Sequence, residues 1–327
     1  MIRIAIIGLG HIGRVHAAAL HRTTGLDLVA CCDHDASSAK ELPAGLPFFD
    51  SPAALLAAGG FDTVVVATPN CTHHAIAREV IEAGYDVIVE KPACSSLAEF
   101  DALQRLASTQ GHHVYYAFHA ALAPEVEALV AHLRESGEMY GELTAFSSRF
   151  YDPYIDAQGR LAPHAHSLDE CWSDSGVNAL SVLDRLHPVD GLQLAWRRQS
   201  GHAAMAPGVL SVSTAYRFGA VAGHPADGVG FGLIDTAWDQ RINYKSTTLY
   251  FGQSGWRLEA NHSDQTLTRW DPQGDPTELA RFDGDRLVNH YLGVFTDYRD
   301  RVKAGSPMNG SAARCIHAKL YEGMPQP

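Results

Sequence analysis

Three glycines near the amino terminus constrain the fold of this chain more than any other feature. Gly8, Gly10 and Gly13 directly follow the apolar run Ile4–Ile7 and directly precede a segment of helical periodicity. In that context the first glycine permits a tight turn, the second lets the backbone approach a phosphate, and the third lets a helix pack closely on a strand. The pattern predicts a strand, a turn and a helix whose N-terminus binds the pyrophosphate of a dinucleotide. The residues expected at this site are Gly8, Gly10, His11, Ile12 and Gly13.

Short apolar runs alternate with helical patterns through the first 120 residues. The runs show little polar alternation, as in strands buried on both faces. They cover residues 4–7, 26–32, 63–67 and 87–89, and helical patterns fill the intervals at roughly 12–23, 35–41, 52–58, 72–83 and 96–110. This alternation predicts a parallel sheet with right-handed crossovers, that is, an α/β Rossmann dinucleotide-binding domain over residues 1–120.

The remaining residues, 121–327, have a different texture. Beyond Gly141 the apolar stretches are longer and rich in Thr, Ser, Tyr and Trp, and glycine-containing turns join several of them. Such segments predict a C-terminal α+β substrate-binding and oligomerisation domain with an open, mostly antiparallel sheet. Residues 311–322 have a helical pattern, and we expect this last helix to pack back on the first domain. An open sheet face favours self-association, so we expect a homo-oligomer, either a dimer or a tetramer.

Composition excludes several classes of partner. Asp and Glu outnumber Lys and Arg by 37 to 25, the net charge is −12, and no basic run occurs. This balance argues against nucleic acids and anionic membranes and leaves small molecules as partners. The apolar start ends at Gly8, well short of a secretory signal, and no later run is long enough to cross a bilayer. Six cysteines without regular spacing are typical of reduced thiols, so we expect a cytoplasmic protein.

A carboxylate at the end of the second predicted strand selects between two dinucleotides. Asp33 follows Gly13 by twenty positions, where it would accept hydrogen bonds from the ribose hydroxyls and repel a 2′-phosphate. We therefore expect NAD as the cofactor, with NADP disfavoured. The neighbouring His34, if protonated, weakens that preference. The alternative is a simple glycine turn beside a solvated Asp33.

Two further segments leave the carboxyl ends of predicted strands, where ligands of open α/β sheets collect. One runs from Thr68 to His73 and the other is Glu90-Lys91-Pro92. Together with the glycine loop they resemble the Gfo/Idh/MocA family of pyridine-nucleotide oxidoreductases, and the resemblance extends over essentially the whole chain. It implies a cofactor pocket that includes Thr68, Pro69, Asn70, His73, Glu90 and Lys91. It also implies that Lys91 points at the reacting carbon beside the nicotinamide.

A lysine at that place has a chemical reason apart from any family. Next to a cationic nicotinamide ring and partly desolvated, the Lys91 ammonium would lose stability relative to the amine and share in moving a hydroxyl proton. The alternative is a strand-end lysine that pairs with Glu90 on the surface.

The second domain carries one segment with a family-like pattern. Many members of the family read Asp-x-Gly-x-His-x-x-Asp at a helix start, and this chain has Asp174 and Gly176 but Asn178 and Ser181 in place of the last two groups. An amide cannot accept a proton, so Asn178 can only hold and orient a hydroxyl. Asp174 and Lys91 are then the candidates to handle the proton. The alternative is a helix start at which Asp174 merely caps backbone N–H groups.

The same segment resembles one branch of the family, the aldose 1-dehydrogenases that act on L-arabinose or D-galactose. The run from Phe118 to Glu127 is similar to that branch as well. This resemblance implies that Lys91, Asp174 and Asn178 surround the anomeric carbon and that His119 touches a sugar hydroxyl. Trp172 and Tyr151 would add stacking faces for the sugar ring, although aromatic residues at such positions commonly serve packing.

These features predict an NAD(P)-dependent sugar dehydrogenase that transfers a hydride from C1 of an aldose and yields an aldonolactone. The enzymatic alternative is oxidation or reduction at a ring carbon of a keto-sugar, an amino sugar or an inositol. A non-catalytic NAD-binding sensor is the alternative from another class. No metal is expected, because His164, His166, Asp169 and Cys171, the one cluster with ligand chemistry at short range, match no zinc spacing.

Overall fold

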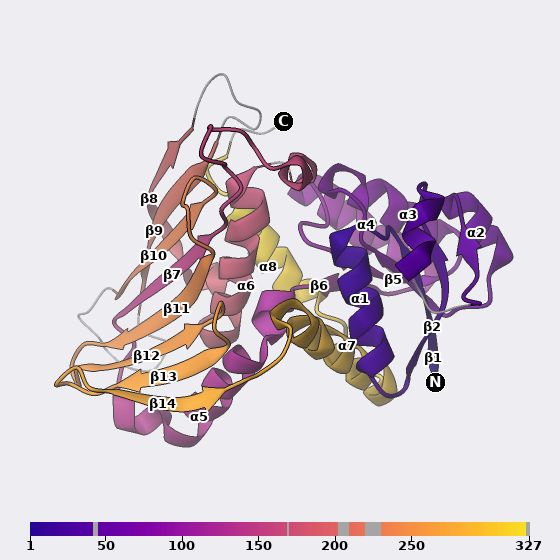
Figure 1. The fold of residues 1–327 in the computed structure, drawn as a ribbon. Helices are drawn as coiled ribbons and strands as arrows, with labels where there is room; N and C mark the ends of the chain where they lie inside the picture. Colours follow the sequence, from indigo (N-terminus) through magenta and orange to yellow (C-terminus); the bar gives the residue numbers. More distant parts are fainter. Residues whose placement is uncertain (42–44, 169, 202–208, 220–229, 325–327) are drawn as a thin grey trace. The chain divides into compact units, whose positions relative to one another are not determined.

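The computed structural model of the 327-residue chain describes residues 1–41, 45–168, 170–201, 209–219 and 230–324 (Figure 1). The chain forms two compact units. The first comprises Met1–His119 together with Leu287–His317, and the second comprises Ala120–Arg286 together with Ala318–Met324. The chain therefore changes unit between His119 and Ala120 and returns to the first unit at Leu287.

The first unit is built on a six-stranded parallel sheet in the order β3-β2-β1-β4-β5-β6. Its strands are β1 (Ile2–Ile7), β2 (Leu26–Cys32), β3 (Phe48–Phe49), β4 (Thr63–Val66), β5 (Asp86–Glu90) and β6 (Val114–Ala117). Its helices are α1 (His11–Arg22), α2 (Pro52–Ala58), α3 (His73–Glu82), α4 (Leu97–Gln110) and α7 (Arg286–Ala304), with most of α8 (Gly310–Tyr321). The strand order reverses beside β1, so the carboxyl ends of β1 and β4 flank the place where such sheets bind ligands. The predicted Rossmann fold is confirmed.

The segment that returns from the carboxyl terminus completes this unit. The Tyr298 hydroxyl on α7 lies 2.7 Å from the Thr63 hydroxyl on β4. The side-chain amide of Asn309 accepts from the backbone N–H of Tyr116 at 2.9 Å and donates to its carbonyl oxygen at 2.7 Å. Tyr116 lies on β6 at the edge of the sheet, so Asn309 satisfies the polar groups that an absent seventh strand would otherwise pair. The structure thus differs from the expected continuous second domain over residues 121–327, because α7 as well as part of α8 belongs to the first unit.

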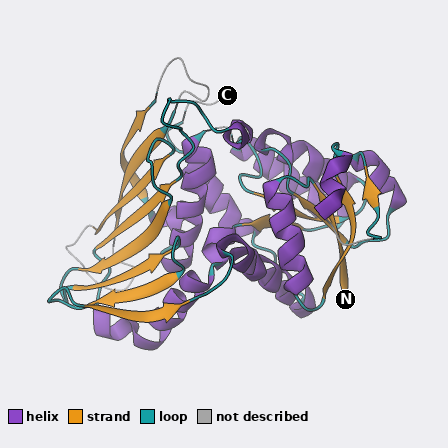
Figure 2. Ribbon diagram, viewed as in Figure 1, coloured by secondary structure: helices purple, strands orange, loops and turns teal. Residues whose placement is uncertain are grey.

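The second unit holds an eight-stranded sheet in the order β14-β13-β12-β11-β7-β10-β9-β8 (Figure 2). Its strands are β7 (Ala145–Tyr151), β8 (Gln193–Ser200), β9 (Ser211–Phe218), β10 (Gly230–Ala237), β11 (Tyr244–Phe251), β12 (Trp256–Asn261), β13 (Thr266–Trp270) and β14 (Pro276–Arg281). All neighbours are antiparallel except β7 and β10, which are parallel. The predicted open, mostly antiparallel sheet is confirmed.

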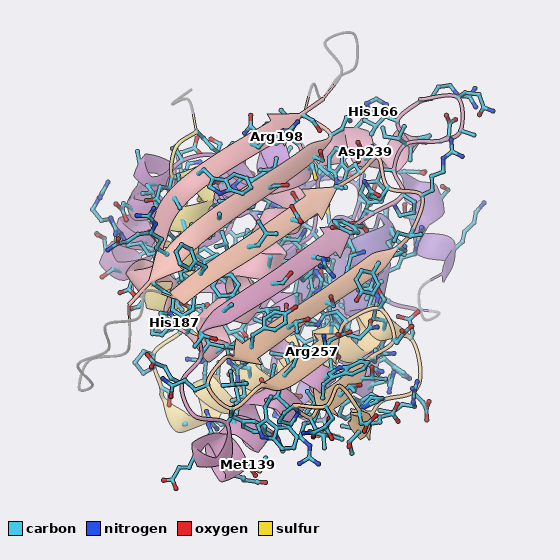
Figure 3. The ribbon with its side chains drawn as sticks, turned by 90° about the vertical axis from the view of Figure 1, so that its left-hand side faces the viewer. Met139, His166, His187, Arg198, Asp239 and Arg257 are labelled. Carbon is cyan, nitrogen blue, oxygen red and sulfur yellow. The ribbon has the colours of Figure 1, made fainter. Side chains whose placement is uncertain are left out.

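Two helices of this unit, α5 (Pro124–Tyr140) and α6 (Val177–Leu186), pack on one face of the sheet. Along β7 the side chains of Phe146, Ser148 and Phe150 are buried on that face, and Arg149 and Tyr151 point to the other. Figure 3 shows the sheet from the face that these helices do not cover. Two large apolar side chains on the strands of this sheet are half exposed, Phe231 on β10 and Trp196 on β8.

The described part of the chain bears on two expectations from the sequence, one about membrane-spanning helices and one about the cysteines. Among these residues no helix is both long enough and apolar enough to cross a bilayer. All six cysteines are present as thiols.

The contact between Asn309 and the edge strand leads to a first prediction. Replacing Asn309 by Ala leaves the backbone N–H of Tyr116 without its partner, whereas the Tyr116 carbonyl oxygen keeps its 2.9 Å bond from the Phe118 N–H. The loss should lower the free energy of unfolding by about 1–3 kcal/mol. Urea denaturation of the two proteins measures the difference. Gln110→Ala, at an exposed position on α4, is the control and should change stability by less than about 0.5 kcal/mol. Equal stability of the two variants would show that Asn309 does not protect the edge.

Candidate active site

The glycine loop has the geometry of a phosphate cradle. Gly8 has a φ of +94°, and a Cβ atom there would lie 2.6 Å from the Ala67 carbonyl oxygen. A Cβ atom at Gly13 would lie 1.9 Å from the Gly8 carbonyl oxygen, so both positions require glycine for the packing of the chain itself. A Cβ atom at Gly10 would meet no described atom within 4 Å. Gly10 therefore leaves room for something outside the chain, as a bound pyrophosphate requires.

Helix α1 begins at this loop. Gly10 is its N-terminal cap, and no side chain of the described residues caps it. The first N–H groups of a helix have no acceptor within the helix, and the helix dipole favours an anion at that end. The backbones of His11 and Ile12 lie in this first turn, so the structure places all five predicted loop residues at the N-terminus of α1.

Asp33 lies beside the same loop. Its Oδ2 atom accepts a 2.6 Å hydrogen bond from the Leu9 N–H within the loop, and its Oδ1 atom accepts from the Asp35 N–H at 2.9 Å. The His34 ring nitrogen lies 3.1 Å from Asp33 Oδ1, but the His34 side chain is 96% exposed. The structure thus holds the Asp33 carboxylate against the glycine loop and leaves the His34 side chain in solvent, and the contact of Asp33 with a ribose stays a prediction.

The segments that follow β4 and β5 are joined by a buried histidine. The ring nitrogens of His73 lie 2.8 Å from the carbonyl oxygen of Pro92 and 2.8 Å from that of Thr68. The ring is 1% exposed, so His73 shapes these two segments from within. The structure therefore brings together the predicted stretch from Thr68 to Asn70 and the Glu90-Lys91-Pro92 stretch, and Lys91 is half-buried at the end of β5.

Glu90 has a different role from the one predicted. Its Oε1 atom accepts hydrogen bonds from His16 Nε2 at 2.8 Å and from the Tyr291 hydroxyl at 2.6 Å, and its Oε2 atom accepts from the Lys91 N–H at 3.2 Å. Burial raises the pKa of the Glu90 carboxyl, but the bonds from His16 and Tyr291 and the charge of Lys91 outweigh burial and lower this pKa below its usual value. Glu90 is thus an inward-facing anion that positions the Lys91 backbone. It is not a surface partner of Lys91, and its contact with the cofactor stays a prediction.

Sequence reasoning missed His16 and Tyr291. His16 lies three positions after Gly13 on the first helix, so its polar side chain on a buried helix face was a signal. Tyr291 is about two hundred positions from Glu90 in the sequence, and no local pattern indicates the contact.

A third residue that sequence reasoning missed supports the loop after β5. His317 on α8 donates from Nδ1 to the Ala313 carbonyl oxygen at 2.7 Å, and its Nε2 atom accepts from the Ala93 N–H at 3.3 Å. Ala93 directly follows Pro92, so the neutral ring fixes the exit of the Lys91 loop. Burial lowers the pKa of His317 to about 4.

His119, predicted to touch a sugar hydroxyl, follows β6 in the first unit. It is 7% exposed, its ring stacks on that of His290, and the two Nδ1 atoms are 3.4 Å apart. The Tyr291 ring is 5.1 Å away. His119 therefore adjoins the side chains that hold Glu90, and its contact with a substrate stays a prediction.

Asp174 and Asn178 lie in the second unit on an irregular helix start. Residues Trp172–Gly176 form a π-helical turn that leads into α6, and such turns are frequent at functional sites. The Asn178 Nδ2 group donates to the Asp174 carbonyl oxygen at 3.2 Å. This bond orients the amide, so its Oδ1 atom is the remaining acceptor, and that atom is buried without a hydrogen-bond donor among the described residues. A substrate hydroxyl is the kind of group that would satisfy it.

The two aromatic residues proposed to stack on a sugar do not line this site. Trp172 is fully buried: its Nε1 group donates to the Leu320 carbonyl oxygen at 2.7 Å, and the Arg197 guanidinium lies 4.6 Å from its ring centroid. Tyr151 lies on the opposite face of the sheet from Phe150, near Tyr244. Trp172 is therefore a core residue, and the alternation of β7 directs Tyr151 away from α6 and Asp174.

Among the described residues, no group of three His, Cys, Asp or Glu side chains is arranged to hold a metal ion. Asp169 and the His164 side chain lie outside the described residues.

A doubly wound unit with a glycine cradle, followed by a unit with an open sheet, defines a two-part protein of the dinucleotide-binding class. Residues 2–118 match the family model of the Gfo/Idh/MocA proteins, described as an oxidoreductase family with an NAD-binding Rossmann fold. The first unit therefore has the Rossmann fold that the resemblance in the sequence implied, and residues 2–118 are similar to the NAD-binding domain of that family.

Several known proteins are similar to this chain. It is 35% identical over 174 residues to UDP-N-acetylglucosamine 3-dehydrogenase of Acidithiobacillus ferrooxidans, a match over 51% of this chain and 48% of that protein. It is 32% identical over 145 residues to D-glucoside 3-dehydrogenase of Escherichia coli, over 42% and 41% of the two chains. The chain thus spans about half the length of these curated relatives. Both names specify oxidation at C3, whereas the sequence resemblance pointed to C1.

The fold of the whole chain also has solved counterparts. An inositol dehydrogenase homologue from Azotobacter vinelandii, crystallised with NADH and myo-inositol, superimposes with a TM-score of 0.78 over 98% of this chain and 93% of that one. At 19% sequence identity this likeness establishes the fold of both units and nothing further.

The geometry around Asp33 gives a second prediction. Asp33→Ala removes the acceptor for the ribose hydroxyls and the negative charge that repels a 2′-phosphate, so NADH affinity should fall about 10- to 100-fold and the ratio of NADPH to NADH affinity should rise. Fluorescence titration with each dinucleotide measures both changes without any substrate. Asp35→Ala, which alters an exposed carboxylate bonded to Ser37, should leave the ratio unchanged. An unchanged ratio in Asp33→Ala would contradict the assigned role.

The buried ring of His317 predicts a pH dependence of stability. In the unfolded chain this ring takes up a proton near pH 6.5, whereas its pKa in the folded protein is about 4. Between those values the unfolded state binds more protons, so stability falls as the pH is lowered through this window. His317→Gln should remove part of that loss, up to about 1.4 kcal/mol per pH unit. Denaturant unfolding at several pH values measures it, with His34→Gln at the exposed site as the control. Parallel curves for wild type and His317→Gln would refute it.

Proposed function

We propose that this protein is an NAD-dependent oxidoreductase that oxidises a secondary hydroxyl on the ring of a sugar or cyclitol, or reduces the corresponding ketone. The glycine cradle, the carboxylate of Asp33 and the strand-end Lys91 support the cofactor assignment. The named activities of the two curated relatives, both 3-dehydrogenases of sugar rings, favour a ring carbon over the anomeric carbon.

The proposal that the substrate is a polyol rests mainly on Asn178. Its buried Oδ1 atom has no donor within the described chain, and a polyol presents hydroxyl groups next to the one that reacts. The amide is held by the Asp174 carbonyl, so it can accept a hydrogen bond from a neighbouring hydroxyl but cannot take up a proton.

The reaction moves a hydride and a proton, and we assign these to different groups. Bound NAD⁺ supplies the acceptor for the hydride that leaves the carbon. We assign the hydroxyl proton to the Asp174 carboxylate, and to Lys91 a hydrogen bond to the same oxygen as it becomes a carbonyl. Glu90 positions Lys91 through its backbone N–H, His16 holds the Glu90 carboxylate, and His317 holds the N–H of Ala93 two positions further on.

Oxidation at C1 of an aldose is the second candidate. The run from Asn178 to Ser181, which replaces the histidine pattern of many family members, favours it. The two candidates differ in one requirement, because oxidation at C1 needs an unsubstituted anomeric hydroxyl.

A panel of polyols separates these functions. We expect NAD-dependent turnover of cyclitols or of methyl glycosides blocked at C1, measured as NADH absorbance. Lys91→Ala should lower kcat/KM by about 10²- to 10⁴-fold, while Lys303→Ala, at an exposed position on α7, should have no effect. Turnover restricted to aldoses with an open C1 would establish the second candidate. Tight NAD binding without turnover of any compound would indicate a sensor.

A further inference from the structure

An arginine of the second unit has no hydrogen-bond or ion-pair partner among the described residues. Arg286 is the last residue of this unit and the first residue of α7, and its side chain is half-buried. A guanidinium that is partly removed from water is unfavourable unless an anion or other acceptors compensate it. The dipole of α7 also opposes a positive charge at this end of the helix. Neither the helix nor its neighbours therefore explain an arginine at this position.

Hydrogen bonds place Arg286 at the edge of the sheet where β11 begins. The turn between β12 and β13 is attached to that strand, because the His262 N–H donates to the Lys245 carbonyl oxygen at 2.8 Å. Gln265, in the same turn, donates from its side-chain amide to the Gly284 carbonyl oxygen at 3.1 Å. Arg286 follows Gly284 by two positions. The segment that carries Arg286 is thus attached through one turn to the strand that carries Lys245.

Asp174 is connected to the same edge of the sheet. Lys245 Nζ lies 2.6 Å from Oδ1 of Asp152, which directly follows β7. Ser175 Oγ lies 3.3 Å from Asp152 Oδ2 and 3.5 Å from Asp174 Oδ2. The carboxyl end of β7 and the amino end of β11 adjoin in the antiparallel pair. Asp174 and Arg286 therefore approach one edge of the sheet of the second unit from different elements.

Electrostatic interactions within the unit agree with this placement. Burial raises the pKa of Tyr154 well above its usual range, the charge of Asp174 raises it further, and the charge of Arg286 lowers it. Burial lowers the pKa of Lys245, the charge of Asp152 raises it, and Arg286 and Asp174 act on this pKa with opposite signs. Arg286 and Asp174 thus act on the same two side chains.

Of the two cations at this edge, Arg286 has the donors that a ligand could use. The Lys245 ammonium has three N–H groups, and it already bonds to Asp152 Oδ1, to Asn243 Oδ1 at 2.7 Å and to the Tyr151 carbonyl oxygen at 3.3 Å. A guanidinium has five N–H donors in a planar fork, which matches the paired oxygens of a carboxylate or a phosphate. The ligand chemistry that Arg286 fits is an anion with two adjacent oxygens.

We propose that Arg286 binds an anionic group of the substrate, so that the sugar or cyclitol that reacts at this site carries a carboxylate or a phosphate in addition to its reacting hydroxyl. This inference rests on the proposed function for the reaction and adds the charge of the substrate. A neutral polyol would leave the guanidinium uncompensated, whereas an acidic one supplies the missing charge. Because the chain has a net charge of −12, its overall field repels anions, and a local cation is needed to select one.

Binding of matched ligands to the NADH complex tests the proposal without turnover. Isothermal titration calorimetry would compare D-glucose with D-glucuronate and with D-glucose 6-phosphate, and D-galactose with D-galacturonate. We expect an acidic sugar to bind about 10- to 100-fold more tightly than its neutral counterpart, because hydrogen bonds between two charged groups are the strong ones. Added salt should reduce this difference. Glucuronate and glucose 6-phosphate distinguish a carboxylate from a phosphate as the preferred anion.

Substitutions of Arg286 show whether this side chain is the source of the preference. Arg286→Gln should weaken binding of the acidic sugar about 10- to 100-fold and change the affinity for its neutral counterpart less than about twofold. A purely structural role would not separate the two affinities. Arg286→Lys keeps the charge without the planar fork and should retain part of the preference. Arg281→Gln removes the same charge from an exposed ion pair with Glu278 and should leave both affinities unchanged.

Equal binding of the acidic and neutral sugars, or a preference for the acid that persists in Arg286→Gln, would overturn the inference. Failure of every acidic sugar to bind would overturn it as well. These measurements need no reduction of NAD⁺, so their outcome is separate from that of the polyol panel. Turnover of neutral polyols without any preference for acids would leave the proposed function in place. Binding of acids that depends on Arg286, without turnover of any compound, would refute the proposed function and retain the anion site.

Discussion

The buried carboxylate of Glu90 is the interaction on which the first unit depends. It accepts hydrogen bonds from His16 on α1 and Tyr291 on α7, and it lies at the end of β5. Removing one partner of such an anion typically costs about 3–5 kcal/mol, because the remaining charge is stranded in the interior. Helix α1 starts at the glycine cradle and β5 ends directly before Lys91, so one carboxylate connects the helix that follows the glycine loop to the strand that precedes the lysine.

This dependence explains why the chain returns to the first unit after the second is complete. Tyr291 caps Glu90, Asn309 covers the edge of β6, and His317 fixes the backbone after Pro92. Asn309 and His317 satisfy the backbone N–H groups of Tyr116 and Ala93, and Tyr291 adds a second donor to the Glu90 oxygen that His16 already contacts. The dinucleotide-binding unit is therefore assembled from two distant stretches, and the C-terminal stretch supplies its polar contacts as well as apolar area.

Local patterns made the first unit predictable and left its supports hidden. The glycine spacing, the strand-end Asp33 and the alternation of strands and helices are properties of short windows, so the fold and the cradle could be predicted from sequence. The return of α7 and the role of Tyr291 depend on partners about two hundred positions away, which no window contains. The prediction for Tyr151 differs, because the sequence itself contained the contrary signal. Side chains alternate between the faces of a strand, so Tyr151 lies on the opposite face of β7 from Phe146 and Phe150. Trp172 is buried by Arg197 and Leu320, which come from other elements.

The two units share one physical device. In each, a buried carboxylate with its own hydrogen-bonded partner adjoins a side chain to which we assign a part in the reaction: Glu90 with His16 beside Lys91, and Asp152 with Lys245 near Asp174. A group that must change protonation in a low-dielectric interior needs neighbours that do not change theirs, because any second titration would be coupled to the first. An Asn at position 178 fits the same logic. An amide at this position can orient a hydroxyl without adding another titrating group next to Asp174.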